Sequence, residues 1–547
     1  MTPFDQASTG LPGIDAILQG LRIGDNVVWQ VDSIDDYRFF AARFVDQAIK
    51  DHRDVVYLRY ASHEPPLPHD PAVTVYNLDA YRGFESFTVR VNTIIAEHGP
   101  GAYYVFDCLS DLLSAWATDL MIGNFFVTTC PYLFELDTVA YFGLLRHSHS
   151  FKTIARIRET TQLLLDIYNV DDARYIHPLK VWNRHSPTMF LPHRCGEDIC
   201  EPVANSLETI NVFSHITRGG AQAAHRYVDY WDRLFMQAEQ CERTGTDREK
   251  TDMVHNLSRL LLGREERMLA LVKTHITLRN ILDVKARLIG TGYIGGKTVG
   301  MLLARAILRR DDAVDWSDLL EPHDSFYIGS DVFYTYLVAN GWWKLWMAHK
   351  TEDGYYSAAA ELREKMLRGV FPDEIREQFL LMLEYFGQSP IIVRSSSLLE
   401  DSFGNAFAGK YESVFCVNQG SPEKRYRDFE NTVRRIFAST MDESALAYRF
   451  QRGLWRADEQ MALLVQRVSG SHRGAYFLPD IAGVGLSHNI FLWNRNMDPR
   501  AGLLRMVVGL GTRAVNRVDD DYPRIVALDM PQVKPHAGIE DTRKYSQ

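Results

Sequence analysis

The chain has 547 residues, of which 46% are hydrophobic and 24% are charged, and its formal net charge at pH 7 is −10. This is a globular composition, and at roughly 100–200 residues per domain the length predicts about three or four structural units. The acidic balance argues against a nucleic-acid partner recognised through a basic face. No apolar run approaches the roughly 20 residues of a membrane-spanning helix, and residues 1–10 lack the basic start and apolar core of a signal peptide. We therefore expect a cytoplasmic protein without a membrane partner; its oligomeric state stays open.

Residues 1–205 alternate short apolar runs with helical patterns, which is typical of α/β layers. Helices are predicted at 36–50 and 84–98, where apolar residues recur every three or four positions. A late strand and turn are predicted at 179–193. Four short apolar runs are predicted to be buried strands: 26–31, 54–60, 102–107 and 125–130.

The cysteines are scattered along the chain and do not form the disulfide framework of a small secreted domain. Cys195 and Cys200 lie close to His193, but a zinc site would need a fourth ligand at a suitable spacing, and none is evident. We interpret these two residues as reduced thiols in a turn-rich segment.

Residues 8–45 carry the run STGLPGIDAILQG, followed by a predicted strand and a loop. This run resembles the opening of RecA-like ATPases of the KaiC type, where a loop with glycines, a lysine and a Ser/Thr cradles phosphates. Here the loop position reads VDSIDDYR. Asp36 and Tyr37 stand in place of the last glycine and the lysine, and Arg38 stands in place of the Ser/Thr.

Three acidic residues of this loop would repel a phosphate group: Asp32, Asp35 and Asp36. Asp107 ends a predicted strand where such ATPases place a magnesium-orienting acid, but without the phosphate loop we interpret it as a strand-end acid. The resemblance implies a RecA-like fold, and the loop argues against an active KaiC-like ATPase. We therefore predict a pseudo-ATPase domain with a docking or sensory role.

Residues 206–288 are predicted to form a helical connector, because the segments 226–240 and 252–288 are long and amphipathic. The region 289–547 mixes helical patterns, such as 374–386, with strand-like runs. We predict that it forms a third domain.

Within this third domain, the segment VRSSSLLEDSFGNAFAGKYES places an arginine and three serines at a strand end, before a loop with glycines. The segment, residues 393–413, is similar to the N-terminal ATP-grasp (PEP/pyruvate-binding) domain of phosphoenolpyruvate synthase and pyruvate phosphate dikinase. Four more elements follow that family's order: 294–308, 463–468, 483–489 and 507–515.

The residue types suit a polyphosphate ligand. Two glycines precede Lys297 and let the backbone approach a ligand, while Lys297 adds a point charge to the positive end of a helix. Arg394 offers a planar fork for two phosphate oxygens, although a strand-end arginine often pairs with a carboxylate such as Glu400 or Asp401. By resemblance, Lys297 and Arg394 are catalytic. The resemblance implies these nucleotide contacts: Gly295, Gly296, Lys297, Arg394, Ser395, Gly409, Ser413, Gln466 and Arg524.

The sequence departs from the family at a metal position. The family's GLGE glutamate ligates Mg²⁺, whereas here that position is Thr512, whose hydroxyl is a weaker ligand. Three acids just downstream could substitute for it, or form a solvated turn: Asp519, Asp520 and Asp521. Thr512, Asp519 and Asp520 are the candidate metal ligands.

A second departure concerns the phosphoryl acceptor. Family enzymes pass phosphate to a histidine on a swivelling domain, and a barrel domain then makes phosphoenolpyruvate from pyruvate. Neither the histidine motif nor barrel-like repeats occur in this sequence. The chain could be a fragment, could act with domains on another polypeptide, or could have kept ATP binding and lost the dikinase reaction.

The sequence thus predicts an α/β multidomain protein: a RecA-like domain with a degenerate phosphate loop, a helical connector and an α+β ATP-grasp domain. Its predicted function is ATP- and Mg²⁺-dependent phosphoryl transfer to a histidine on a separate domain or partner, with pyruvate as final acceptor by resemblance only. The alternative is a non-catalytic ATP sensor or scaffold with a pseudo-ATPase docking domain.

Overall fold

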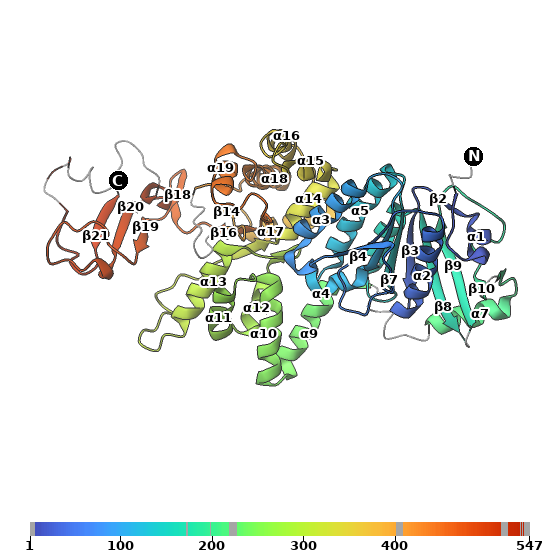
Figure 1. Cartoon of the computed structure of the whole chain (residues 1–547). Coiled ribbons are helices and arrows are strands. Elements are labelled where there is room, and N and C mark those ends of the chain that lie inside the picture. The colour runs from blue at the N-terminus through green and yellow to red at the C-terminus, as the bar shows by residue number, and fades with distance from the viewer. Residues whose placement is uncertain are drawn as a thin grey trace. The chain divides into compact units, whose positions relative to one another are not determined.

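The computed structural model describes residues 6–170, 173–196, 199–217, 227–400, 409–515, 523–535, 538 and 540. The chain divides into two compact units, which we describe separately. The first unit comprises residues 1–385, 393–414 and 426–465, and the second comprises residues 386–392, 415–425 and 466–547. Both contain helices and strands, so the chain is an α/β multidomain protein (Figure 1).

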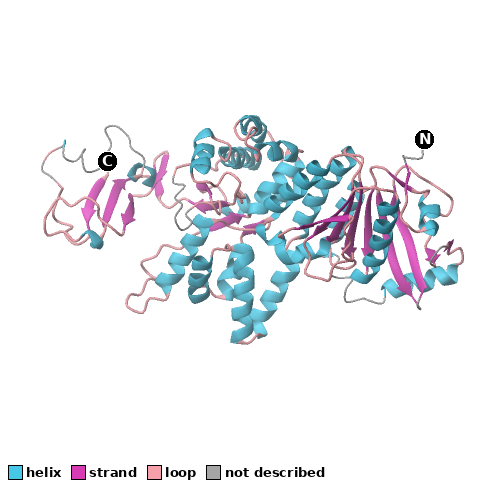
Figure 2. Cartoon of the chain, in the orientation of Figure 1, coloured by secondary structure: helices cyan, strands magenta, loops and turns pink. Residues whose placement is uncertain are grey.

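The first unit contains a nine-stranded sheet in the order β11-β10-β9-β8-β3-β7-β6-β4-β5. The strands from β8 to β5 in this order pair in parallel, and β9, β10 and β11 extend the sheet in antiparallel fashion. Figure 2 shows these strands side by side with helices packed along them. The strands are β3 (Asn26–Val31), β4 (Val55–Arg59), β5 (Val73–Asn77), β6 (Tyr103–Cys108), β7 (Val139–Leu145), β8 (Leu163–Val170), β9 (Ala173–Val181), β10 (His193–Cys195) and β11 (Cys200–Pro202).

Apolar residues on both faces explain why the central strands are buried. Every residue of β6 and all but one residue of β3 are buried, as expected for parallel strands covered by helices on both sides. A two-stranded pair, β1 (Gln6–Ala7) and β2 (Leu21–Arg22), precedes the sheet. The helices of this part are α1 (Pro12–Leu18), α2 (Ile34–Lys50), α3 (Phe84–His98), α4 (Leu112–Trp116), α5 (Asp119–Glu135), α6 (Phe151–Thr160) and α7 (Ser206–Thr217).

Most of the predicted elements of this region are confirmed, but the strand predicted at 125–130 is wrong. That run lies inside α5, which begins after the N-cap Thr118 and packs against α3, α6 and α14 (Ser330–Ala339). A helix covered on several sides is apolar all round. Its short apolar run therefore cannot be distinguished from a buried strand by periodicity.

The interpretation of Cys195 and Cys200 as reduced thiols is also wrong. The antiparallel pairing of β10 with β11 places the two residues directly opposite each other, and they form a disulfide. The sequence spacing alone contained no information about this pairing.

The predicted connector is helical, but its long second segment is divided into three helices. Each of these helices begins with a polar N-cap: Thr246 for α10, Glu265 for α11 and Thr277 for α12. These side chains bond backbone N–H groups that a continuous helix would have used internally. The four helices are α9 (Tyr230–Thr244), α10 (Asp247–Leu261), α11 (Glu266–His275) and α12 (Leu278–Lys285).

A five-stranded sheet in the order β12-β13-β16-β14-β15 follows in the chain. Its strands are β12 (Leu288–Ile289), β13 (Ser325–Ile328), β14 (Ile391–Ser395), β15 (Ser413–Cys416) and β16 (Leu463–Arg467). The accompanying helices are α13 (Gly296–Arg309), α14, α15 (Trp343–His349), α16 (Ser357–Met366), α17 (Asp373–Phe386), α18 (Pro422–Ser439) and α19 (Glu443–Gln451).

The second unit contains a β-hairpin and a three-stranded antiparallel sheet. The hairpin is β17 (Ser471–Arg473) with β18 (Tyr476–Leu478), and the sheet has the order β19 (Ile481–Leu486), β20 (Leu503–Val508), β21 (Arg524–Ala527). A short helix, η6 (Gly511–Ala514), follows β20.

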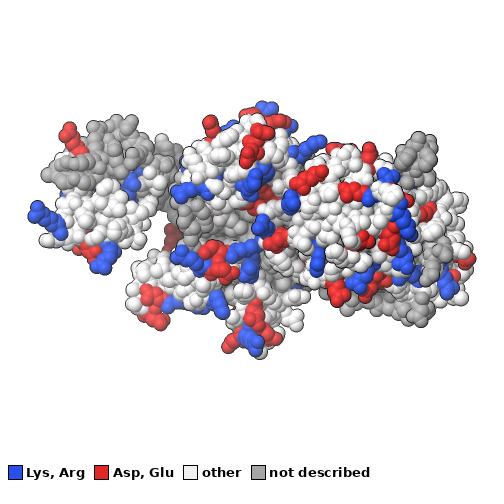
Figure 3. All heavy atoms as spheres, in the orientation of Figure 1, with Lys and Arg blue, Asp and Glu red and all other residues white. Residues whose placement is uncertain are grey.

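Two properties of the described residues bear on possible partners. Among these residues, no helix is both long enough and apolar enough to cross a membrane. On the face shown in Figure 3, Lys and Arg side chains are interspersed with Asp and Glu side chains. The coloured residues on this face therefore do not form the basic stripe that recognises nucleic acids.

Candidate nucleotide-binding site

Lys297 lies in the first turn of α13 and is held by the end of β14. Its Nζ donates a hydrogen bond to Ser395 Oγ (3.0 Å) and forms an ion pair with Glu400 Oε1 (2.5 Å). The Glu400 side chain is fully buried, whereas 18% of the Lys297 side chain is exposed. The buried carboxylate thus orients the ammonium group, which keeps an exposed edge toward solvent.

The glycine pair before Lys297 allows two backbone segments to come unusually close. A Cβ atom on Gly295 would lie 1.3 Å from the carbonyl oxygen of Ser396, and one on Gly296 would lie 1.9 Å from that of Glu400. The φ angle of Gly295 is also positive, at 78°. We predicted a close approach to a ligand, and the approach that the structure shows is to the protein's own loop.

The same loop occupies part of the N-terminal end of α13. The Gly296 N–H donates to the Ser397 carbonyl (3.1 Å), and the Thr298 N–H donates to Ser396 Oγ (3.1 Å). Free N–H groups at a helix start are what a phosphate group would bind. Two of these N–H groups are already bonded within the protein. We therefore expect the charge of Lys297 to contribute more to phosphate binding than the N–H groups of the helix end.

All three serines after Arg394 are fully buried and bonded to protein groups. Ser395 Oγ donates to Glu400 Oε1 (2.9 Å), and Ser397 Oγ donates to the Glu459 carbonyl (2.6 Å). Ser396 Oγ donates to the Ile294 carbonyl (2.9 Å). These hydroxyls therefore hold the loop in place around Lys297.

Arg394 differs from its neighbours on β14. It is half-buried, between the fully buried Val393 and Ser395, and adjacent strand residues point to opposite faces of a sheet. Among the described residues, none forms a hydrogen bond or ion pair with its guanidinium group. Glu400, one possible partner, is paired with Lys297 instead, and Asp401 lies outside the described residues. The guanidinium is thus available to an anionic ligand as far as the described part of the chain is concerned.

Gly409 and Ser413 flank the start of β15. Gly409 is exposed, has a positive φ of 72°, and has no atom within 4 Å of where a Cβ would stand. Glycine is therefore required there for its backbone conformation and not for space. Ser413 is the exposed first residue of β15.

The remaining predicted site residues belong to the second unit or lie outside the described residues. Gln466 is half-buried near the end of β16, Thr512 is exposed in η6, and Arg524 is the exposed first residue of β21, opposite Met506. Asp519 and Asp520 lie outside the described residues. Of the proposed metal ligands, the described residues thus contain only the Thr512 hydroxyl. No group of three or more His, Cys, Asp or Glu side chains suited to a metal occurs among them.

Sequence reasoning missed the charged residues beneath the Lys297 loop. Glu459 is fully buried, forms an ion pair with Arg449, and accepts a hydrogen bond from the Tyr411 hydroxyl (3.1 Å). Burial raises the pKa of Glu459, and the nearby Arg449 opposes this shift. Because the Glu459 carbonyl also accepts the Ser397 hydroxyl, this pair supports the loop.

The same segment contacts α3 of the nine-stranded-sheet region. The Glu459 N–H donates to Glu85 Oε2 (2.9 Å), which also accepts the Tyr334 hydroxyl (2.7 Å). Ser86 Oγ donates to Asp458 Oδ1 (2.5 Å). Pairs such as 85 and 459 are too far apart in sequence for any spacing rule to predict.

The β3–α2 turn, where a RecA-like protein would hold phosphates, contains only residues 32 and 33. Asp32 pairs with Arg146 (2.7 Å), and Asp36 accepts a hydrogen bond from Asn169 (2.7 Å). Tyr37 is fully buried and donates its hydroxyl hydrogen to the Phe106 carbonyl (2.7 Å). A phosphate-cradling loop needs several residues with free backbone N–H groups. This turn does not provide them.

Asp107 is also used internally. It is buried at 1% exposure, accepts a hydrogen bond from the Tyr57 hydroxyl (2.5 Å), and accepts the N–H groups of Tyr60 (2.8 Å) and Ala61 (2.9 Å). These bonds fix the chain that leaves β4. They agree with the interpretation of Asp107 as a strand-end acid.

Comparison with known proteins bears on the part of the chain that contains Lys297 and Arg394. No curated protein matches the chain. Residues 291–547 match the family described as pyruvate phosphate dikinase, AMP/ATP-binding domain. This confirms the resemblance drawn from the segment 393–413. The chain therefore carries an ATP-grasp-type domain like the ATP-binding domain of pyruvate phosphate dikinase, which implies nucleotide binding.

Proposed function

We propose that this protein binds ATP through Lys297 and Arg394 and transfers a phosphoryl group to a histidine on a separate domain or partner protein. The observation that supports this proposal most is that Lys297 has a buried carboxylate partner whereas Arg394 has none among the described residues. Lys297 is oriented by a buried carboxylate, and the half-buried Arg394 on the adjoining strand has no partner among the described residues. A partly exposed guanidinium without a partner among the described residues can pair with an anionic ligand.

The two cations have different tasks in this proposal. Arg394 binds two phosphate oxygens through its planar fork, which is geometrically selective. Lys297 supplies a point charge whose position is set by Glu400 and Ser395. Phosphoryl transfer depends mainly on positioning and charge neutralisation, which both residues would supply. Pyruvate as the final acceptor rests on resemblance alone.

The other predicted contacts are assigned by resemblance to the family. Ser395 supports Lys297, while Gly409 and Ser413 would approach the phosphates. We assign Gln466 to the adenine side and Arg524 to the phosphate side. Thr512, Asp519 and Asp520 would hold Mg²⁺, which would supply positive charge to the transferred phosphoryl group.

Calorimetric titration with ATP, with and without Mg²⁺, tests the binding. We expect Arg394→Ala to lower ATP affinity at least tenfold and Arg394→Lys to restore it only in part, because lysine keeps the charge and loses the fork. Equal affinities of wild type and Arg394→Ala would refute the assignment of Arg394. Transfer is then measured with radiolabelled ATP and an isolated histidine domain of a phosphoenolpyruvate synthase, where Lys297→Ala should abolish labelling.

A second function, a non-catalytic ATP sensor or scaffold, is favoured by two other observations. Thr512 replaces the metal-binding glutamate with a single exposed hydroxyl. In addition, residues 458 and 459 connect the Lys297 loop to α3, which would let ATP binding affect the sheet region. ATP binding without labelling of any supplied histidine domain would support the sensor over the transferase.

In both cases we assign a docking role to residues 1–205, a RecA-like pseudo-ATPase domain, joined by the connector 206–288 to the ATP-grasp domain 289–547. The parallel strand order β8-β3-β7-β6-β4 and the two-residue β3–α2 turn support this division. ATP binding that survives the double variant Lys297→Ala, Arg394→Ala would indicate a second nucleotide site. That result would argue against a pseudo-ATPase role for residues 1–205.

A further inference from the structure

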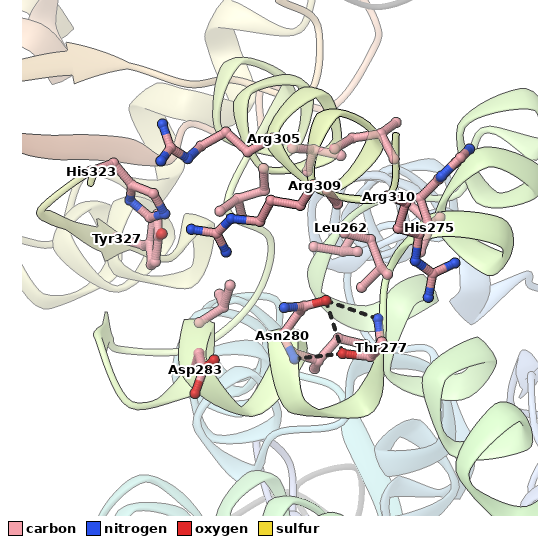
Figure 4. A pocket seen from close by; sticks show the side chains of 18 of the residues that line it. Leu262, His275, Thr277, Asn280, Asp283, Arg305, Arg309, Arg310, His323 and Tyr327 are labelled. Carbon is pink, nitrogen blue, oxygen red and sulfur yellow. Dashed lines mark hydrogen bonds between the residues drawn. The ribbon is translucent and has the colours of Figure 1, made fainter. Parts of the chain in front are cut away.

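A cavity of about 230 Å³ lies between the C-terminal half of α13 and the helices α11 and α12. Figure 4 shows its opening, with the arginines of α13 on one side and Thr277, Asn280 and Asp283 of α12 on the other. Its lining along α13 extends from Val299 to Arg310 and does not include Lys297, so it is distinct from the proposed ATP site.

The floor of this cavity is apolar. Its side chains are buried members of one hydrophobic cluster that joins the connector helices to α13. They are Leu262, Val272, Ile281, Val284, Val299 and Leu303. A ligand could therefore bury an apolar body there and remove it from water.

Four arginines line the cavity, and one of them, Arg287, is paired with a carboxylate, Asp324 (2.6 Å). Arg305 donates to the Glu321 carbonyl (2.9 Å) and Arg310 to the Thr274 carbonyl, so each is bonded to a neutral group. Within the described part of the chain, none of Arg305, Arg309 and Arg310 forms an ion pair with a carboxylate. The one acidic residue lining the cavity, Asp283, pairs with Arg279 on its own helix (3.0 Å).

A helix end alone does not explain this arrangement. Arginines in the last turn of a helix are favoured by the helix dipole, which accounts for Arg309 and Arg310 individually. However, Arg287 and His323 come from other segments and line the same cavity. Burial lowers the pKa of His323, and Arg305, Arg309 and Arg287 lower it further, while Asp324 opposes this shift.

Two residues that line the cavity each contain a buried nitrogen atom without a hydrogen-bond partner. Arg305 Nε and His275 Nδ1 have no hydrogen-bond partner in the described structure. Buried polar groups in folded proteins are nearly always bonded to protein, water or ligand. These two polar atoms are therefore free to bond a polar group of a ligand.

We propose that this cavity binds a small amphiphilic anion, with its apolar body on the floor and its phosphate or similar oxyanion head between Arg305, Arg309 and Arg310. The volume is below the range of about 300–1,000 Å³ that holds drug-sized ligands, so the body is a short alkyl chain or a single ring. In Figure 4, Arg309 extends across the opening, where it would meet the head group.

The probe for this proposal is hexyl phosphate, compared by calorimetry with inorganic phosphate and 1-hexanol on the full chain. We expect saturable binding of hexyl phosphate, and at least tenfold weaker binding of each half-molecule. Arg309→Ala should weaken hexyl phosphate binding at least tenfold, and Ala306→Phe, which fills the cavity, should do the same without a change of charge. ATP should not displace the probe, and ATP affinity should be unchanged in both variants.

The matched control is Arg243→Ala, which removes an exposed arginine of α9 that does not line the cavity. Its affinity for hexyl phosphate should equal that of the wild type. Absence of saturable binding would overturn the proposal, as would equal losses in Arg243→Ala and Arg309→Ala, or displacement of the probe by ATP. Because ATP affinity is measured separately, failure here is distinguishable from failure of the proposed ATP site.

Discussion

Glu85 on α3 and Lys350 at the end of α15 form a buried ion pair, with Oε1 and Nζ 2.5 Å apart and both side chains at most 5% exposed. Glu85 also accepts hydrogen bonds from the Tyr334 hydroxyl and the Glu459 N–H. One carboxylate thus joins α3, α14, α15 and the segment before β16. It connects the sheet region to the loop that holds Lys297.

Removing this carboxylate should destabilise the first unit strongly. Glu85→Ala leaves Lys350 buried without its counter-charge, and breaking a buried pair costs about 3–5 kcal/mol. Glu85→Gln keeps one acceptor and should cost less. The measurement is the free energy of unfolding in urea by circular dichroism, with the exposed Glu97→Ala as control. A loss below about 1 kcal/mol for Glu85→Ala, the scale of an exposed pair, would show that the contact is dispensable.

Lys297 and Arg394 should differ in their effects on stability. Lys297→Met leaves the buried Glu400 unpaired and should lower the free energy of unfolding by about 1–3 kcal/mol. The double variant Lys297→Met, Glu400→Gln should regain most of this loss. Arg394→Ala removes no protein partner in the described structure and should leave stability within about 0.5 kcal/mol of wild type. The measurement is the free energy of unfolding of the wild type and of these three variants. Equal losses of stability in Lys297→Met and Arg394→Ala would contradict the pairing of Lys297 with Glu400.

Three glycines should respond differently to alanine. Gly295→Ala places a Cβ at 1.3 Å from a carbonyl oxygen, so the loop must move and Lys297 loses its orientation. Gly409→Ala has open space and pays only for its positive φ, about 1–2 kcal/mol. Gly300, inside α13 with no atom near its Cβ position, is the control and should gain about 0.5–1 kcal/mol. Thermal unfolding midpoints and ATP affinity should be lowest for Gly295→Ala, intermediate for Gly409→Ala and highest for Gly300→Ala.

Asp458 should make stability depend on pH. Burial raises its pKa from 3.8 to about 7, and the neighbouring Glu85 raises it too. Between these pH values the folded state holds a proton that the unfolded chain releases, so this group's contribution to stability falls as pH rises from about 4 to about 7. Asp458→Asn cannot ionise, so its stability relative to wild type should be higher at pH 8 than at pH 5. An unchanged difference between the two pH values would show that Asp458 titrates normally.

Restoring the family's acid should strengthen the effect of Mg²⁺. Thr512→Glu supplies a carboxylate oxygen, the ligand that Mg²⁺ prefers, and should increase the gain in ATP affinity on adding Mg²⁺ several-fold. Thr512→Gln has the same shape without the charge and serves as control. Calorimetry with and without Mg²⁺ measures the gain. The same gain in both variants would mean that position 512 does not face the metal.

Local sequence determined much of the secondary structure and the position of the nucleotide-binding domain. The helices 36–50 and 84–98 follow from hydrophobic periodicity, and the strands at 26–31 and 102–107 follow from short continuous apolar runs. Each segment carries its pattern by itself. The motif around Arg394 can likewise be recognised from the local sequence alone. It correctly indicated an ATP-binding domain.

Tertiary structure decided which groups are paired. The run 125–130 became part of a helix because α3, α6 and α14 surround it. Cys195 meets Cys200 because the register of β10 and β11 places them opposite each other. Glu400 pairs with Lys297 and not with Arg394. Glu85 meets Lys350 and Glu459 only in the folded chain. Hydrophobic periodicity is a property of one or two helical turns of local sequence. A buried charge needs a partner because its desolvation is unfavourable, and that partner can come from a segment hundreds of residues away in sequence.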